Sequence, residues 1–168
     1  MLEIGAGSGQ HARHFAAVLA GLSWQPTDLD PAHRLSIDAW CDGIDNVRPA
    51  LALDATAAAW PVASADAVLS INMVHIAPWQ AALGLLAGAG RILPPDGLLV
   101  LYGPFMLAGR HTAESNARFD ASLRAQDPDW GVRDLDDVGR AAAEHGFDLE
   151  AVHQMPANNL TVIFRKRI

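Results

Sequence analysis

The sequence predicts a doubly wound α/β protein whose sheet is mostly parallel, with one antiparallel strand near its edge. Three observations indicate this fold class. Strand and helix patterns alternate through the first two thirds of the chain. A glycine-rich turn, Gly5-Ala6-Gly7-Ser8-Gly9, joins the first strand to the first helix, and a loop suited to a hairpin separates the last two strand patterns. Repeated βα units give parallel strands, and a closing C-terminal β-hairpin reverses one of them.

The strand patterns are short apolar runs that end at a glycine or a polar residue. The first five are expected at 1–4, 23–29, 47–53, 66–72 and 98–102. The fifth is hydrophobic throughout, as expected of a strand that is covered on both faces. The hairpin strands are expected at 147–153 and 160–165.

The helix patterns lie between these strands. The first is expected over 9–22, because its apolar residues recur at helical spacing on one face. A second helix begins at Pro31, since proline is tolerated in a first turn, and a third covers 78–92. A long inserted segment follows the fifth strand and carries a helix over 113–125, and a last helix covers 135–145.

Composition narrows the function classes. The 168 residues suffice for one domain, 1–168, and the net charge of -7 disfavours bulk nucleic-acid binding, which needs a basic face. Cys41 is the only cysteine, so a reducing cytoplasmic location is expected, without a disulfide or thiolate metal site. No stretch reaches the roughly 18 apolar residues of a membrane span. Because no His, Asp and Glu set has metal-ligand spacing, we expect no metal; the sequence does not give the oligomeric state.

The carboxyl ends of the strands carry the candidate cofactor site, because ligands of open parallel sheets bind there. After the glycine turn, these ends carry Asp28, Asp54 and Asn72. Asp28 follows Glu3 by 25 positions, close to the spacing at which an acidic residue meets a ribose. A carboxylate can accept from both vicinal hydroxyls. Asp28 or Asp30 could instead cap the next helix, and Asp30 fits that cap better.

Two cofactors compete for such a turn. Residues 7–12 also satisfy the dinucleotide pattern G-x-G-x-x-A, which leaves a nucleotide-dependent oxidoreductase as an alternative. Glycine at every other position, with Glu3 just before, favours a different cofactor that also contains adenosine. A short-chain dehydrogenase would need Tyr-x-x-x-Lys, but the only tyrosine is Tyr102 and the only lysine is Lys166. No G-K-[ST] follows the glycines, which excludes a Walker phosphate loop.

The series Glu3-x-Gly5-x-Gly7-x-Gly9, Asp28, Asp54 and Asn72 resembles the class I S-adenosylmethionine-dependent methyltransferases, which have a Rossmann-like fold. Longer strings resemble one uncharacterised methyltransferase-like family, long described as a domain of unknown function. These strings are 9–12, 24–28, 70–79, 101–105, 109–112 with 115–116, 127–131 and 155–160. That family has a further N-terminal segment, so we expect a lid segment to be absent from this chain.

The resemblance implies S-adenosyl-L-methionine as cofactor and a role for each matching residue. Glu3 with Gly5, Gly7 and Gly9 would line the methionine end, and Asp28 would hold the ribose hydroxyls. Asp54 would hydrogen-bond the adenine amino group, with Ala55 against the ring. Asn72 would line the floor near the sulfonium.

Methyl transfer mainly requires alignment in a dry site, and a base only where the acceptor must lose a proton. The polar candidates near the strand ends are His75, Tyr102, His111, Asn116 and Asp120. His75 could instead pack at a strand–helix junction, Tyr102 could bond a neighbouring loop, and Asp120 could lie on a solvated helix face. Three further histidines are interpreted as helix-surface residues: His11, His14 and His33.

Together these observations predict a methyltransferase with a small-molecule acceptor. The alternative from another class is a non-catalytic module that keeps the fold within an assembly.

Overall fold

The computed structural model describes residues 1–168 and contains a sheet of seven strands in the order β3-β2-β1-β4-β5-β9-β8. The parallel strands are β1 (Leu2–Ile4), β2 (Gln25–Asp28), β3 (Leu51–Ala52), β4 (Ala67–Ile71) and β5 (Leu98–Gly103). β9 (Asn159–Lys166) runs antiparallel between β5 and β8 (Phe147–Met155). This arrangement confirms the predicted fold class. The direction of strand progression reverses between β1 and β4, which is where such sheets bind ligands.

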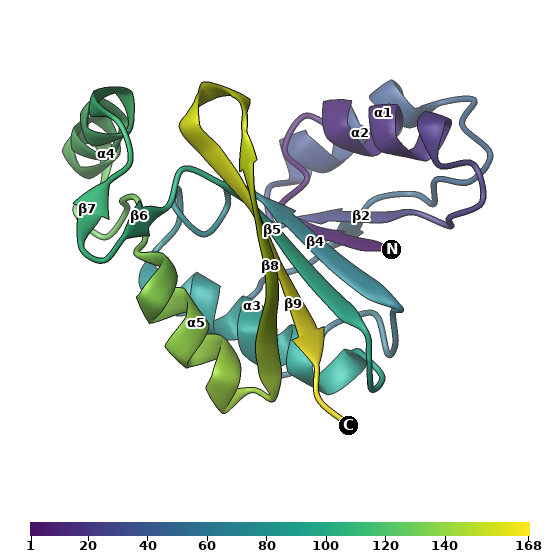
Figure 1. Cartoon of the computed structure of the whole chain (residues 1–168). Coiled ribbons are helices and arrows are strands. Elements are labelled where there is room, and N and C mark those ends of the chain that lie inside the picture. The colour runs from purple at the N-terminus through teal and green to yellow at the C-terminus, as the bar shows by residue number, and fades with distance from the viewer.

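Helices cover both faces of the sheet. On one side lie α1 (Gln10–Val18) and α2 (Pro31–Cys41), and on the other α3 (Trp79–Ile92) and α5 (Leu135–Glu144) (Figure 1). α4 (Glu114–Gln126) lies away from the sheet beside a small ribbon, shown at the upper left of Figure 1. The ribbon consists of β6 (Met106–Leu107) and β7 (Arg110–His111), and the turn of the β8–β9 hairpin is a short 3-10 helix, Pro156–Asn158. None of the helices is both long and apolar enough to cross a bilayer.

Two expected elements are shorter than predicted, and one was missed. The first helix ends at Val18, and the Asn46 side chain donates to the carbonyl groups of Ala16, Leu19 and Leu22 at and beyond this end. The strand expected over 47–53 is reduced to β3, since Pro49 has no N–H to donate. The β6–β7 ribbon within the inserted segment has strands of only two residues, too short for an alternation pattern.

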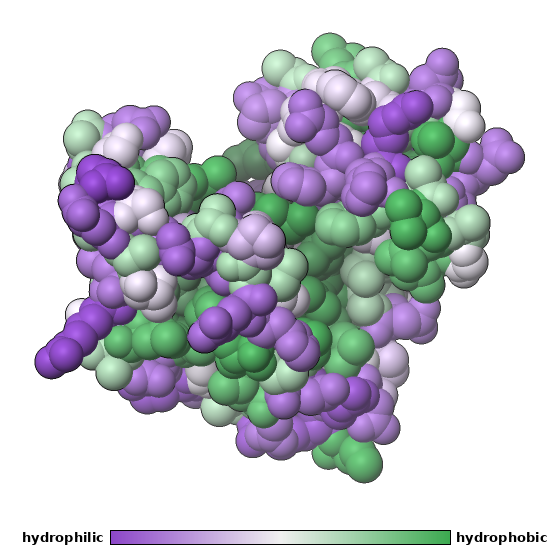
Figure 2. All heavy atoms as spheres, turned by 45° about the horizontal axis from the view of Figure 1, so that its top comes forward, coloured by the Kyte–Doolittle hydropathy of each residue, from purple (hydrophilic) through white to green (hydrophobic).

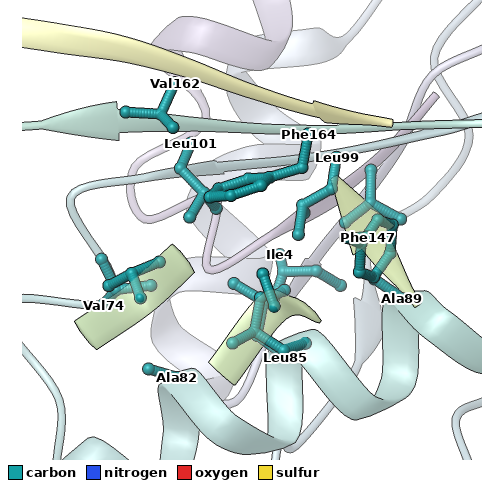
Figure 3. Packing of buried hydrophobic residues seen from close by; sticks show 14 of the residues in the cluster. Ile4, Val74, Ala82, Leu85, Ala89, Leu99, Leu101, Phe147, Val162 and Phe164 are labelled. Carbon is teal, nitrogen blue, oxygen red and sulfur yellow. The ribbon is translucent and has the colours of Figure 1, made fainter. Parts of the chain in front are cut away.

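The main core lies between the sheet and helices α3 and α5. Alternate residues of β5 and β9 point into it, among them Leu99, Leu101 and Phe164, and Leu85 of α3 packs against them (Figure 3). Trp24 and other residues form a second cluster beneath α1 and α2.

The half of the sheet formed by β4, β5 and β9 is covered on one face only. Val100 and Tyr102 of β5 point to the open face and are half-buried. An apolar groove of about 340 Å³ follows this face, between α1 and the C-terminal hairpin, and Figure 2 shows its apolar surface. Its upper end, at Tyr102, therefore adjoins the strand ends that carry the candidate site.

Candidate functional site

The glycine turn leaves the carboxyl end of β1 and enters α1. Gly5, Gly7 and Gly9 have φ values of 69°, 59° and 90°, which favour glycine. A Cβ on Gly9 would lie 2.6 Å from the Cα of Ile37, and one on Gly5 would lie 2.9 Å from the Cγ of Met73. A Cβ on Gly7 would meet nothing within 4 Å. Gly9 therefore packs α1 against α2, whereas Gly7 borders open space at the strand ends.

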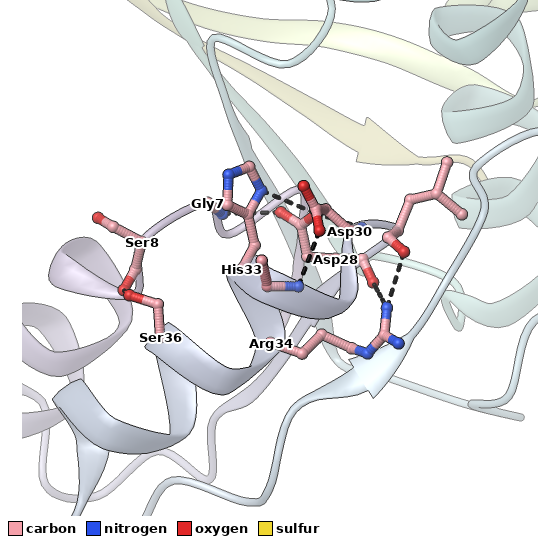
Figure 4. A network of polar contacts seen from close by, with 9 residues as sticks. Gly7, Ser8, Asp28, Asp30, His33, Arg34 and Ser36 are labelled. Carbon is pink, nitrogen blue, oxygen red and sulfur yellow. Dashed lines mark hydrogen bonds and ion pairs between the residues drawn. The ribbon is translucent and has the colours of Figure 1, made fainter.

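Asp28 ends β2, and its side chain turns back to the glycine turn (Figure 4). Its Oδ2 accepts from the N–H of Gly7 at 2.9 Å, and its Oδ1 accepts from the N–H of Asp30, also at 2.9 Å. The Nδ1 atom of His33 lies 3.2 Å from Oδ1. Asp30 caps α2 by accepting from the N–H of Ala32 at 2.8 Å, as predicted. The capping alternative for Asp28 is thereby removed.

Asp54 follows β3 at the same edge of the sheet. Its Oδ1 accepts from the N–H and the hydroxyl of Thr56, at 2.8 and 2.7 Å, and its other oxygen makes no hydrogen bond within the chain. Ala55 is buried with its backbone against Gly84 of α3. Leu29, directly after Asp28, is 64% exposed. The sequence analysis did not single out Leu29, because a lone leucine between Asp28 and Asp30, at the end of a strand pattern, gives no sign of being exposed.

Glu3 lies within β1, directly before the turn, and is buried. Its Oε2 accepts from the indole N–H of Trp24 at 2.7 Å. Burial raises the pKa of Glu3 to about 7, against the opposing effect of the Trp24 hydrogen bond. The carboxyl can therefore change charge near neutral pH, and a cationic ligand group nearby would favour its ionised form.

The end of β4 packs Asn72 and His75 against Gly103 of β5. Asn72 has a φ of 60°, and its N–H donates to the carbonyl of Tyr102 at 2.8 Å. A Cβ on Gly103 would lie 2.5 Å from Nε2 of His75 and 3.1 Å from Oδ1 of Asn72. His75 is completely buried, and its Nδ1 accepts from the N–H of Arg133 at 3.1 Å.

Burial, reinforced by the charge of Arg133, lowers the pKa of His75 to about 3. The imidazole is therefore neutral at physiological pH. It joins the end of β4 to the segment before α5, which is the packing role given above as the alternative for this residue.

Two further candidates join α4 to the tip of the C-terminal hairpin. The hydroxyl of Tyr102 accepts from the Nδ2 of Asn159 at 3.0 Å. Asn116 is buried and donates to the hydroxyl of Thr112 at 3.0 Å and to the carbonyl of Asn158 at 2.9 Å. Three of the family-like strings thus meet in one network, in which both side chains already have partners within the chain.

His111 and Asp120 face each other from β7 and α4. The Nε2 of His111 lies 3.7 Å from Oδ2 of Asp120, which also accepts from the Nε of Arg124 at 3.1 Å. The N–H of Val132 donates to Oδ1 of Asp120 at 2.7 Å. Two buried side-chain atoms lack a hydrogen-bond partner in the chain: Nδ1 of His111 and Nε2 of His75. Such atoms are rare in folded proteins.

Residues 1–166 match the family described as Protein of unknown function (DUF938). The chain belongs to this family. Its fold is also similar to three solved structures. Human N-acetylserotonin methyltransferase in complex with SAM gives a TM-score of 0.85 at 15% identity, over 100% of this chain and 47% of that chain. For TnmH the TM-score is 0.84 at 18% identity, over 99% of this chain and 49% of that chain. PigF with SAH gives 0.83 at 14% identity, over 98% and 50%.

This DUF938 chain thus shares the fold of these three proteins, one of them a methyltransferase, and spans about half their length. The strand ends place Gly7, Asp28 and Asp54 at one edge of the sheet. The catalytic candidates lie at the ends of β4 and β5 and on the α4 side.

Proposed function

We propose that the protein is an S-adenosylmethionine-dependent methyltransferase acting on a small-molecule acceptor. The observation that carries the proposal is the open space over Gly7, a left-handed glycine whose N–H is held by Asp28. Backbone without a side chain, beside a carboxylate that can still accept a hydrogen bond, suits a nucleoside.

The residues at the strand ends fit the parts of this cofactor. Asp28 binds the ribose hydroxyls, and the unpaired oxygen of Asp54 accepts from the adenine amino group. The exposed Leu29, and Ala55, which follows Asp54 in the chain, supply apolar contact for the adenine ring. Glu3 and the glycine turn serve the amino-acid end, where the raised pKa of Glu3 makes its charge responsive to a ligand ammonium. Asn72 borders the reacting end.

When bound, S-adenosylmethionine would supply a methyl group carried on a positively charged sulfur, which an acceptor can take. The chain has to align the acceptor and exclude water. Tyr102, His111 and Asn116 form the acceptor wall. His111 lies beside the Asp120 carboxylate. Where the acceptor must lose a proton, we assign to His111 the role of the base that accepts it. His75 moves no proton and holds the wall in place.

Calorimetry tests the cofactor assignment directly. The protein is titrated with S-adenosylhomocysteine, S-adenosylmethionine and NADH under identical conditions. We expect micromolar binding of the two adenosyl compounds and none of NADH. Binding of NADH alone would show that the site belongs to a nucleotide-dependent oxidoreductase.

A second candidate is a non-catalytic module that binds the cofactor within an assembly. Tyr102 and Asn116 favour it, because both make hydrogen bonds within the chain. Methyl transfer from a radiolabelled cofactor to cell extracts separates the two functions. Labelled product supports the enzyme, and persistent absence of label despite intact cofactor binding supports the module.

A further inference from the structure

His33 contacts the candidate cofactor site although the sequence pattern predicts a helix-surface residue. Its side chain is 51% exposed, yet its ring turns towards β2 (Figure 4). Nδ1 lies 3.2 Å from Oδ1 of Asp28. A carboxylate can only accept, so Nδ1 carries the hydrogen of this bond.

The Asp28 carboxylate can accept about four hydrogen bonds. The N–H of Gly7 occupies one position on Oδ2, and the N–H of Asp30 and the ring of His33 occupy both positions on Oδ1. One position is left, whereas a ribose presents two vicinal hydroxyls. Both backbone donors are fixed by the path of the chain. Only the His33 ring, which is half exposed, can turn away into solvent.

We propose that His33 is a displaceable partner of Asp28, which occupies one ribose-hydroxyl position in the free protein and leaves it when the cofactor binds. The inference rests on the proposed function, because it takes Asp28 as the carboxylate that binds the ribose. His33 is then a positioning residue that acts through Asp28. Its displacement connects cofactor binding to pH.

The direction of this effect follows from the charges around His33. Asp28 faces it from β2, Asp30 lies at the start of α2, and the buried Glu3 lies behind Asp28 in β1. Arg34 turns its guanidinium to two backbone carbonyl oxygens, and the glycine turn contributes only an uncharged amide. A protonated imidazole therefore binds Asp28 more strongly than a neutral one. Protonation of His33 would therefore strengthen its contact with Asp28 and weaken cofactor binding.

The test is calorimetry with S-adenosylhomocysteine at about pH 5.5 and about pH 8, in two buffers of different ionisation enthalpy, which together count released protons. For wild type we expect affinity to fall about two- to fivefold at the lower pH, as for an exposed ion pair. His33→Ala should bind at least as tightly as wild type at the higher pH. It should show a smaller pH dependence and release fewer protons than wild type, and the remainder belongs to the buried Glu3 carboxyl, which both proteins retain.

Two further variants isolate the charge of His33 from its bulk. His33→Gln retains an uncharged donor near Asp28 and should release as few protons as His33→Ala. His14→Ala removes another exposed helix histidine, which lies on α1 against Phe15, and should behave as wild type.

The outcomes distinguish this inference from the proposed function. Equal pH dependence and proton release in wild type and His33→Ala overturn the inference and leave the function standing. A tenfold loss of affinity in His33→Ala at the higher pH also overturns it, because His33 would then assist binding. If wild type binds no S-adenosylhomocysteine at either pH, the function fails, and the inference fails with it.

Discussion

The two sides of the candidate site use their polar side chains differently. On the cofactor side, Asp28 and Asp54 keep unused acceptor positions, and Gly7 borders open space. On the acceptor side, Tyr102 and Asn116 form hydrogen bonds that join α4, β5 and the C-terminal hairpin. The difference teaches that the first side keeps polar positions free, as our proposal requires, whereas the second is held by contacts between distant segments. Changes on the first side should alter binding, and changes on the second should alter stability.

Replacing the ribose carboxylate has the largest expected effect. Asp28→Ala removes an ionised acceptor, and hydrogen bonds to charged groups contribute about 1.5–3 kcal/mol each. We expect the affinity for S-adenosylhomocysteine to fall at least about tenfold, with the fold retained. Calorimetry measures the affinity, and circular dichroism the fold. Unchanged affinity would place the ribose elsewhere.

Asp30→Ala is the matched control for that variant, since it removes a neighbouring carboxylate with a purely structural role. Loss of the α2 N-cap should lower the free energy of unfolding by about 1 kcal/mol. Cofactor affinity should stay within about twofold of wild type. A larger loss of affinity than in Asp28→Ala would reverse the two assignments.

Glu3→Gln tests the buried carboxyl before the glycine turn. Since burial raises the pKa of Glu3 in the folded protein to about 7, from its ordinary value of 4.5, the folded state binds the proton more tightly than the unfolded state. Its contribution to stability is therefore complete below about pH 4.5 and is lost as the pH rises through about 7.

The variant has no such titration, and its amide oxygen can still accept from Trp24. We expect the free energy of unfolding of Glu3→Gln to rise, relative to that of wild type, by on the order of 1–3 kcal/mol between about pH 4 and pH 8. Urea unfolding at both pH values measures the difference. Parallel stability curves for the two proteins would contradict the raised pKa.

The positions of the strand-end residues could be predicted from the sequence because these residues follow local rules. The turn glycines, Asp28 and Asp54 each end a strand, and parallel strands bring such ends to one edge. Asp30 was identified as the cap from its position before Pro31, and the structure confirms it.

The acceptor side could not be predicted in this way, because its contacts connect residues far apart in the chain. Nothing near His75 in the sequence indicates that Arg133 donates to its ring. His33 lies on the helix surface as predicted, but its contact with Asp28, five residues earlier at the end of β2, was not foreseen for a related reason. Local patterns give the position of a residue on its element, and tertiary packing decides what its polar atoms bind.

Two glycines of the same turn should respond differently to alanine. Gly9→Ala would place a Cβ 2.6 Å from the backbone of Ile37, so it should lower stability by more than Gly7→Ala. Gly7→Ala has room for its methyl group within the chain, and its positive φ costs about 1–2 kcal/mol. Because the new methyl would occupy the proposed cofactor space, affinity should fall about tenfold. Thermal unfolding and calorimetry of both variants test the contrast, and full affinity in Gly7→Ala would mean that the open space is not used.

The smallest effect is expected on the acceptor side. Asn116→Ala leaves the carbonyl of Asn158 without this donor and should cost about 1 kcal/mol of unfolding free energy. Affinity for S-adenosylhomocysteine should not change, because the side chain bonds the hairpin tip rather than the strand ends. Ser115→Ala is the control. The hydroxyl of Ser115 is 3.4 Å from the Nδ2 of Asn158 at an exposed position, so the loss of this hydroxyl should lower the free energy of unfolding by less. A loss of cofactor affinity in Asn116→Ala would show that the two sides are coupled, because the hairpin tip would then control the shape of the cofactor cleft.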